Sequence, residues 1–325
     1  MIKSAWKLQL RLAIVSMIMF GMVFVILAIA GNLIGLGGSV YFYFILALGI
    51  TFIQYLAGPK MVEMSMGVRY VSESEFPELH QMVEELAHEA NLPKPKVAVS
   101  SMSVPNAFAY GRTKRDGHVC VTSGIMGLLD KEELKAVLGH EMSHIKHNDM
   151  MITTIISVIP LICYYVGISS MFSSNDDNGG GLLVILGIAG YFIGQLLVLA
   201  VSRIREYYAD EGSVQLGCKP EKLASALYKL VYGAARCPER DIKEVEGSKA
   251  FFLNDVSNAG KEITRLNQLD LNNDGVIGAD ELEHLRNFNI NINTSTKFTE
   301  ALSTLPDMLK RIKKLAELQE EYGYQ

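Results

Sequence analysis

Long stretches without aspartate, glutamate, lysine or arginine constrain the fold of this chain more than any other feature. They run between Arg11 and Lys60, between Asp149 and Asp176, and between Asp177 and Arg203. A membrane-spanning helix needs about 20 mostly apolar residues, so the first stretch has room for two such helices and each later stretch for one. We therefore expect four transmembrane helices, in hairpins at residues 1–57 and 151–202.

The lysines and arginines next to these apolar stretches would all lie on the same side of the membrane if there are four spans. They precede the first span, follow the second, precede the third and follow the fourth, at Lys3, Lys7, Arg11, Lys60, Arg69, Lys146, Arg203 and Arg205. Because cytoplasmic loops carry an excess of these residues, we predict a multi-pass protein with both termini cytoplasmic, in the plasma or inner membrane if the source is prokaryotic. A buried helical hairpin is the alternative for 151–202, since Ser, Thr and Gly are scattered through 152–171.

Charge and cysteine content argue against two other classes of protein. The net charge is -5 and the chain has no long basic run, so we expect no nucleic acid partner. The four cysteines are far apart and form no C-x-x-C pair. Nothing resembles a disulfide framework, which favours free thiols in a reducing compartment.

A charged block at residues 58–150 separates the two hairpins. Apolar spacing predicts a helix over 75–90, and short apolar runs at 97–99 and 118–122 predict strands. Asp130, with Glu133 three residues later, is a good N-cap for a helix over 131–147. The predicted fold class is therefore mainly α, with a small sheet in the cytoplasmic domain.

The helix predicted at 131–147 contains His140, Glu141 and His144 in an H-E-x-x-H pattern. Residues four apart share one face of a helix. The two imidazoles are thus placed to hold one zinc ion, with Glu141 beside them as a general base. Leu134, Val137 and Leu138 make this helix amphipathic, so the motif is expected to face a protein core.

A catalytic zinc ion needs a third protein ligand and an open position for water. His147 lies about 10 Å along the helix axis from His140, by the rise per residue of a straight helix, so we expect a solvated or interfacial histidine there. Glu206 and Asp210 are again four residues apart. This pair suits a zinc ligand, Glu206, and a carboxylate, Asp210, that accepts the free N–H of a ligand histidine.

The motifs H-E-M-S-H at 140–144 and S-R-I-R-E-Y-Y-A-D at 202–210 resemble those of the HtpX-type membrane metallopeptidases, relatives of the CAAX-prenyl endoprotease. P-N-A-F-A at 105–109 is similar to the family's N-A-F-A edge strand, and S-T-L-P at 303–306 with Arg311 is similar to its S-T-H-P-P…R-I segment. The resemblance departs at Leu305, where the family usually has histidine, and at 257–295, which is an insertion.

The resemblance implies a zincin-type peptidase that cleaves misfolded or regulated membrane proteins, with protein or peptide substrates and the lipid bilayer as its partners. It also implies that Asn106 and the backbone of Ala107 align the substrate as an added strand. Arg203, Tyr207 and Tyr208 are candidates for stabilising the oxyanion, although ordinary interfacial roles suit them equally. The rivals are a CAAX-type processing protease and a calcium-regulated membrane scaffold with an inactive zinc site.

The insertion contains D-L-N-N-D-G-V-I-G-A-D-E at 270–281, which matches the calcium loop of an EF-hand at every fixed position. The expected calcium ligands are Asp270, Asn272, Asp274, the backbone carbonyl of Val276, and Glu281. Residues 261–269 and 281–288 are expected to form the flanking helices. Residues 289–300 lack the glycine of a second loop, so the EF-hand is predicted to be single.

The predicted organisation has six parts. They are transmembrane hairpins at 1–57 and 151–202, a peptidase domain in two pieces at 58–150 and 203–256, an EF-hand insertion at 257–295, and a C-terminal helix within 296–325. The predicted cofactors are one catalytic zinc ion and one calcium ion.

Overall fold

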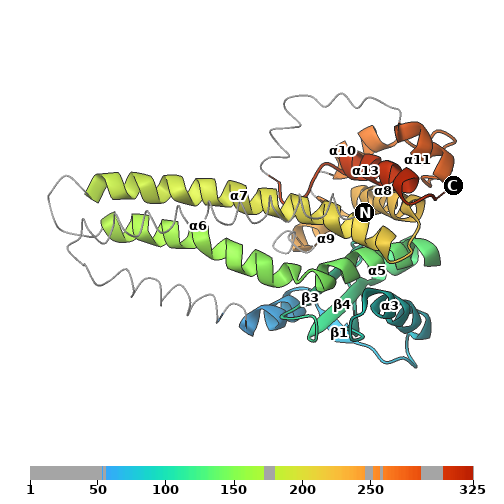
Figure 1. Ribbon diagram of the computed structural model, residues 1–325, viewed down its shortest axis with the longest axis horizontal. Coiled ribbons are helices and arrows are strands. Elements are labelled where there is room, and N and C mark those ends of the chain that lie inside the picture. Colours follow the sequence, from blue (N-terminus) through green and yellow to red (C-terminus); the bar gives the residue numbers. More distant parts are fainter. Residues whose placement is uncertain are drawn as a thin grey trace. The chain divides into compact units, whose positions relative to one another are not determined.

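The computed structural model describes residues 53, 56–171, 180–245, 252–256, 259–286 and 303–324 (Figure 1). The chain divides into two compact units, of which one contains residues 151–204 and the other residues 58–150 and 205–325. The predicted hairpin at 1–57 lies almost entirely outside the described residues, as do most of the loop at 173–181 and all of 289–300.

The unit that contains residues 151–204 is built from parts of two long helices, α6 (Asp149–Met171) and α7 (Gly180–Gln215) (Figure 1). They approach closely at Gly167 and Gly187, where a Cβ added to Gly187 would lie 2.5 Å from the Cα of Gly167. Small residues of this kind let helix backbones pack closely in membranes.

Within the described residues, one helix, Gly181–Gln215, is long and apolar enough to cross a membrane. Its exposed apolar side chains include Leu182, Ile185, Ile188, Phe192, Ile193 and Leu196. An exposed apolar surface of this extent is typical of a helix that faces lipid. α7 also runs without a break from this apolar segment into the residues that carry Glu206 and Asp210.

The other unit is organised around a four-stranded sheet in the order β1-β2-β4-β3. The strands are β1 (Val68–Tyr70), β2 (Lys96–Ser100), β3 (Ala107–Gly111) and β4 (Gly117–Thr122). β2 runs parallel to β4, whereas β1 and β3 are antiparallel to their neighbours. The strands predicted at 97–99 and 118–122 are thus β2 and β4, and β3 forms an edge of the sheet.

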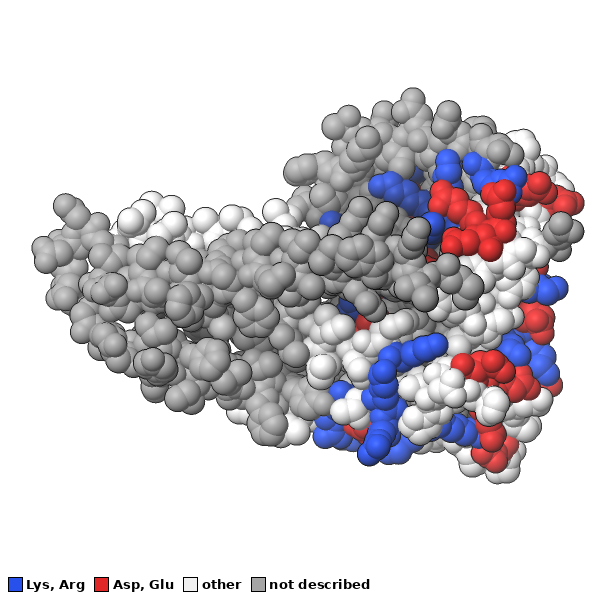
Figure 2. All heavy atoms as spheres, viewed as in Figure 1, with Lys and Arg blue, Asp and Glu red and all other residues white. Residues whose placement is uncertain are grey.

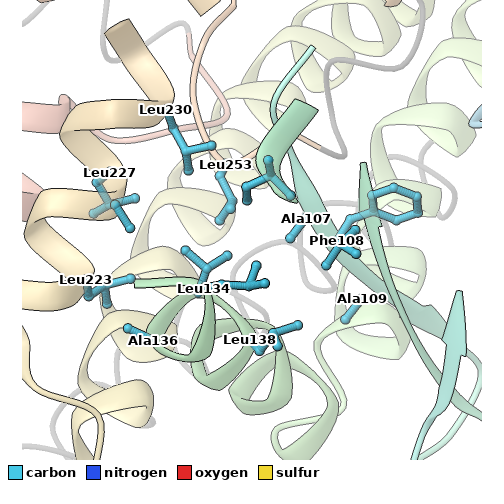
Figure 3. Packing of buried hydrophobic residues seen from close by; sticks show 14 of the residues in the cluster. Ala107, Phe108, Ala109, Leu134, Ala136, Leu138, Leu223, Leu227, Leu230 and Leu253 are labelled. Atoms are coloured by element: carbon cyan, nitrogen blue, oxygen red, sulfur yellow. The ribbon is translucent and has the colours of Figure 1, made fainter. Parts of the chain in front are cut away.

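Helices α3 (Pro77–Ala90), α4 (Ser123–Leu128) and α5 (Lys131–Lys146) contact this sheet, and α8 (Pro220–Arg236) packs against α5 and α4. α5 begins where the sequence predicts, because the Asp130 side chain accepts the Glu133 N–H and the Glu133 side chain accepts the Asp130 N–H. Figure 3 shows Leu134 and Leu138 of α5 between β3 on one side and α8 on the other. This core fixes α5 beside the edge strand.

The rest of the unit comprises α9 (Glu239–Val245), α10 (Ala259–Leu266), α11 (Ala279–Arg286) and α13 (Met308–Glu321). The expected flanking helices of the calcium loop correspond to α10 and α11, each of which begins two residues earlier than predicted. α11 begins earlier because Glu281 reaches back to accept the Gly278 N–H at 2.9 Å. On the face drawn in Figure 2, Lys and Arg are interspersed with Asp and Glu.

Candidate metal centre

The helix α5 presents His140, Glu141 and His144 on the side that meets α7. The Nε2 atoms of the two histidines lie 3.1 Å apart, and their rings are arranged edge to face. His140 is fully buried, and Glu141 is 3 % exposed. The motif is therefore enclosed by protein, as the amphipathic character of α5 predicts.

Glu206 on α7 completes a cluster with these two histidines. Its Oε2 atom lies 3.5 Å from His140 Nε2, and its Oε1 atom lies 3.7 Å from His144 Nε2. Glycines allow the two helices to cross this closely, because a Cβ on Gly212 would lie 2.0 Å from the Oγ of Ser143. The three residues form the one group within the described chain whose side-chain atoms are placed to hold a metal ion, all within 4.8 Å of one another.

The geometry of this group fits zinc. Ligand atoms about 2.0–2.1 Å from a tetrahedral zinc ion lie about 3.3 Å from one another, close to the separations found here. Glu206 Oε2 is buried and, among the described residues, has no hydrogen-bond partner. A buried carboxylate oxygen without a hydrogen bond is costly. The charge of Arg311, whose Nη1 lies 3.3 Å from this oxygen, offsets part of that cost, and a bound metal ion would add to this compensation. Two imidazoles and one carboxylate are a donor set of catalytic zinc sites.

An aspartate lies behind each histidine. His140 Nδ1 is 2.9 Å from Asp210 Oδ1, and His144 Nδ1 is 2.6 Å from Asp149 Oδ2. These contacts leave both Nε2 atoms facing Glu206. Burial raises the pKa of Asp149, but hydrogen bonds and charge interactions with His144 and Arg205 outweigh it and lower this pKa to about 2, so Asp149 stays ionised.

The sequence does not predict that Asp149 and its partner Arg205 lie beside His144. Asp149 follows His144 by only five residues, but on a continued helix it would not face that histidine. Asn148 takes a left-handed conformation, with φ of 54°, and ends α5. The helix is therefore interrupted at Asn148, and an asparagine just after the end of a motif helix is a local signal for such a break.

His147 is not part of the metal-binding group. It is the C-cap residue of α5, and its Nδ1 lies 2.9 Å from the carbonyl oxygen of Ser143. The side chain is exposed. Its ring centroid is 6.1 Å from that of Tyr208, one of the candidate oxyanion groups.

Glu141 contacts the edge strand. Its Oε2 atom accepts a hydrogen bond from the backbone N–H of Ala109 at 2.6 Å. Burial raises the pKa of Glu141 above its ordinary value, as is favourable for a general base that must take up a proton. The bond also shows that the backbone groups of β3 that do not pair with β4 point toward Glu141.

Asn106 stands at the start of β3 and is fully buried. Its N–H donates to Thr122 Oγ1 at 2.8 Å, and its Oδ1 accepts the N–H of Leu253 at 3.2 Å. The side chain therefore fixes the edge strand to the segment 252–256. The backbone of Ala107, the next residue, belongs to the same face of the strand as that of Ala109.

In the loop between α10 and α11, two of the predicted calcium ligands, Asp270 and Glu281, accept hydrogen bonds from the loop backbone. The backbone N–H groups of Asp274 and Gly275 donate to the two carboxylate oxygens of Asp270. Glu281 Oε1 accepts the N–H of Leu271 at 2.7 Å, so Glu281 folds back over the start of the loop. The other predicted ligands, Asn272 and Val276, are each bonded to Asp274.

A glycine with positive φ and a buried isoleucine also lie in this loop. Gly275 has φ of +81°, a value that favours glycine. Ile277 is 1 % exposed and packs in the core. The loop is attached to the peptidase unit through Tyr228, whose hydroxyl donates to Asn267 at 3.2 Å.

Comparisons with known proteins agree with this site. Residues 73–319 match peptidase family M48. A protease HtpX homolog of Methanothermobacter thermautotrophicus is 56% identical over 228 residues, which cover 70% of this chain and 87% of that protein. The protease HtpX homolog 2 of Methanosarcina mazei is 40% identical over 224 residues, which cover 66% and 76% of the two chains.

The crystal structure of S. mikatae Ste24p has a similar fold. The TM-score is 0.50 at 16% sequence identity, and the match covers 94% of this chain and 67% of that chain. The family match extends over most of the sequence and includes every residue of the proposed metal centre. This chain therefore belongs to peptidase family M48 and is a metalloprotease of the HtpX type.

Proposed function

We propose that His140, His144 and Glu206 bind one catalytic zinc ion and that the protein is a membrane-bound endopeptidase. The observation that carries this proposal is the convergence of the three donor groups beside Glu141, where Glu206 Oε2 is buried without a hydrogen bond. When bound, the zinc ion lowers the pKa of a water molecule and polarises the scissile carbonyl. Three protein ligands would leave room for that water.

Glu141 acts as the general base in this proposal. Its carboxylate accepts a proton from the attacking water and later gives it to the nitrogen of the leaving amine. The bond from the Ala109 N–H to Glu141 Oε2 holds the carboxylate at the edge of the sheet. Asp210 and Asp149 keep the two histidines oriented with Nε2 toward the metal.

The edge of β3 is the proposed substrate-binding strand. The Asn106 carbonyl oxygen accepts the N–H of Thr122 at 2.9 Å, so Asn106 pairs with β4. Backbone groups alternate along a strand, and those of Ala107 and Ala109 therefore face away from β4, on the side of Glu141. A substrate that adds to this edge in extended form lies beside the general base. The backbone N–H and C=O of Ala107 would form hydrogen bonds with the substrate, while Asn106 holds the strand in place.

Leu305 removes one candidate for oxyanion stabilisation. The family usually has a histidine there, and the Leu305 side chain has no donor. Arg203, Tyr207 and Tyr208 are the remaining candidates for stabilising the oxyanion. We further propose that the substrates are misfolded or regulated membrane proteins, that the chain crosses the membrane four times, and that the active site faces the cytoplasm.

Purified, detergent-solubilised protein tests the zinc and protease assignment. We expect about one zinc ion per chain and hydrolysis of casein that a chelator abolishes and added zinc restores. If the protein binds zinc but does not hydrolyse casein, the result would instead favour the alternative of a calcium-regulated membrane scaffold with an inactive zinc site. Labelling of single cysteines placed at Asn175 and Ser257 tests the four spans, which require the two positions to lie on opposite sides of the membrane.

We propose in addition that the loop at 270–281 binds one calcium ion. The specific observation is that Asp270 and Glu281, at the two ends of the loop, both turn inward onto its backbone. Asp270, Asp274 and Glu281 are the carboxylates among the ligands, and a single hand with few charges is expected to have modest affinity, about 10⁻⁵–10⁻³ M. Calorimetric titration of the whole protein should detect this binding, and Glu281→Gln should abolish it.

A further inference from the structure

Arg311, on the C-terminal helix α13, is the largest side chain that is fully buried in the described chain. Its Nε and Nη2 atoms donate to the two oxygens of Asp210 at 2.9 and 2.7 Å. Its Nη1 donates to the carbonyl oxygen of Leu253 at 2.9 Å and lies 3.3 Å from Glu206 Oε2. One guanidinium thus contacts both the carboxylate behind His140 and the proposed zinc ligand Glu206.

A buried guanidinium is costly unless it is paired and its donors are satisfied. Here the planar, two-pronged contact with Asp210 holds that carboxylate in one orientation, as only arginine can. Asp210 Oδ1, which receives the Nη2 bond, is also the atom that lies 2.9 Å from His140 Nδ1. Arg311 therefore holds Asp210 in place, and Asp210 in turn holds the ligand His140.

The same arrangement recurs behind the second histidine. Asp149 Oδ2 lies 2.6 Å from His144 Nδ1 and 3.1 Å from Arg205 Nη2. Each ligand histidine is thus backed by an aspartate that is itself held by an arginine. Arg205 neighbours Glu206 on α7, whereas Arg311 comes from the far end of the chain. A second, independent pairing of this kind indicates that the arginines serve the metal centre.

We propose that Arg311 is a positioning residue for zinc, and that α13 completes the metal centre. Arg311 fixes Asp210 and hence His140, and its charge holds Glu206 Oε2 toward the metal position. Two of the three ligands therefore depend on a helix that lies beyond the insertion. This inference rests on the proposed zinc site. If that site were wrong, the wild-type protein itself would bind no zinc at His140, His144 and Glu206.

Zinc affinity, measured by competition with a chelator, tests the proposal in Arg311→Met and Arg311→Lys. Both variants should bind zinc about 10–100-fold more weakly than wild type, as removal of groups that orient metal ligands typically does. The visible spectrum of the cobalt-substituted protein should also change, because Glu206 is no longer held. In Arg311→Met with Asp210→Asn, the loss should be smaller than the product of the single losses, because both substitutions break one chain of contacts.

The control is Arg265→Met, which breaks the ion pair between Arg265 Nη1 and Asp307 Oδ2, at 2.6 Å, beside the start of α13. This variant should keep wild-type zinc affinity. Thermal unfolding of the zinc-free proteins separates folding from metal binding, and Arg311→Lys keeps the buried charge if Arg311→Met does not fold. A folded Arg311→Lys protein with wild-type zinc affinity and an unchanged cobalt spectrum would overturn the proposal and leave Arg311 a purely structural tie to Leu253.

Discussion

The metal centre and the loop at 270–281 hold their carboxylates in opposite ways. In the loop, every proposed ligand comes from one run of twelve residues, and backbone N–H groups of the same run orient the carboxylates. In the metal centre, α5 and α7 each supply proposed ligands, and the side chains of Asp149, Asp210, Arg205 and Arg311 form ion pairs around them. A local site forms with its loop, whereas the metal centre forms only when distant elements are packed together.

This difference has a consequence for how the two sites respond to substitution. In the loop, residues 271–275 are exposed, with Leu271 at 56%, whereas Asp270 and Glu281 are buried but bonded to the loop's own backbone. In the metal centre, His140 and Asp210 are fully buried, so a changed partner leaves charged or polar groups unpaired in protein. The largest effects of substitution are therefore expected at the metal centre.

Glu141→Gln should produce the largest effect on activity. The amide cannot take a proton from water, and loss of a general base typically costs about 10²–10⁴ in rate. The variant should still bind zinc, because Glu141 is not one of the ligands. Hydrolysis of casein and zinc content are measured on the same preparation. Near wild-type turnover would show that another group is the base.

Glu262→Gln should raise stability above neutral pH. Burial, with Asp307 and Asp255 nearby, raises the pKa of Glu262 from 4.5 to about 7, and its Oε2 has no hydrogen-bond partner among the described residues. Between these values the folded protein keeps a proton that the unfolded chain releases, so stability falls as pH rises through this window. The full effect is about 3 kcal/mol.

Unfolding of wild type and Glu262→Gln from pH 4 to 8 measures this effect. The two proteins should be most alike near pH 4, where the wild-type carboxyl is protonated in both states. The advantage of the variant should then grow up to about pH 7, the pKa of the folded protein. A difference that does not vary with pH would mean that Glu262 titrates normally.

Asp149→Asn and Asp210→Asn should each weaken zinc binding by about 10–100-fold, or about 1–3 kcal/mol. Asp210 should have the larger effect, because it is fully buried and bonded twice to Arg311. Chelator competition measures both affinities, and unfolding of the zinc-free variants serves as the control. Equal affinities for wild type and Asp149→Asn would confine the supporting role to Asp210.

Calcium should have the smallest effect on the peptidase. α10 is tied to the start of α13 by Arg265 and Asp307, and α11 is tied to α13 by Arg286 and Glu320, at 3.2 Å. Ordering of the loop can thus reach Arg311 through α13. We expect activity to change by no more than a few fold across the range of calcium binding, about 10⁻⁵–10⁻³ M.

The activity assay is run with zinc held constant and with Glu281→Gln as the matched control. A change in wild type that is absent from the variant supports regulation. A flat response in a protein that binds calcium makes the loop a stabilising element only.

The features that the sequence predicts well are those whose interactions are local. Asp130 and Glu133 cap α5 through their own side chains, and His140 and His144 share a face because of helix geometry alone. Glu206 is identified by its spacing from Asp210 and by family resemblance. The first two of these inferences depend on residues within four positions of one another, whereas that for Glu206 also needs the family resemblance.

The features that the sequence does not predict depend on tertiary contacts. The partners of Arg311, Asp210 and Leu253, lie 101 and 58 residues away. Family resemblance singles out Arg311, but nothing in the sequence of α13 predicts these partners. Arg205 resembles a positive residue at the end of a membrane span, and its bond to Asp149 depends on the turn at Asn148. The hydrogen bond from the Ala109 N–H to Glu141 likewise cannot be predicted from a motif, because a motif describes side chains and not backbone groups.

Zinc content of Glu206→Ala, compared with His147→Ala, tests the central assignment most directly. The structure places Glu206 Oε2 3.5 Å from His140 Nε2, whereas His147 is bonded to the Ser143 carbonyl at the end of α5. The account predicts that purified Glu206→Ala has lost its zinc and that His147→Ala retains about one ion per chain, both in folded protein. Zinc retained in Glu206→Ala and lost in His147→Ala would contradict it.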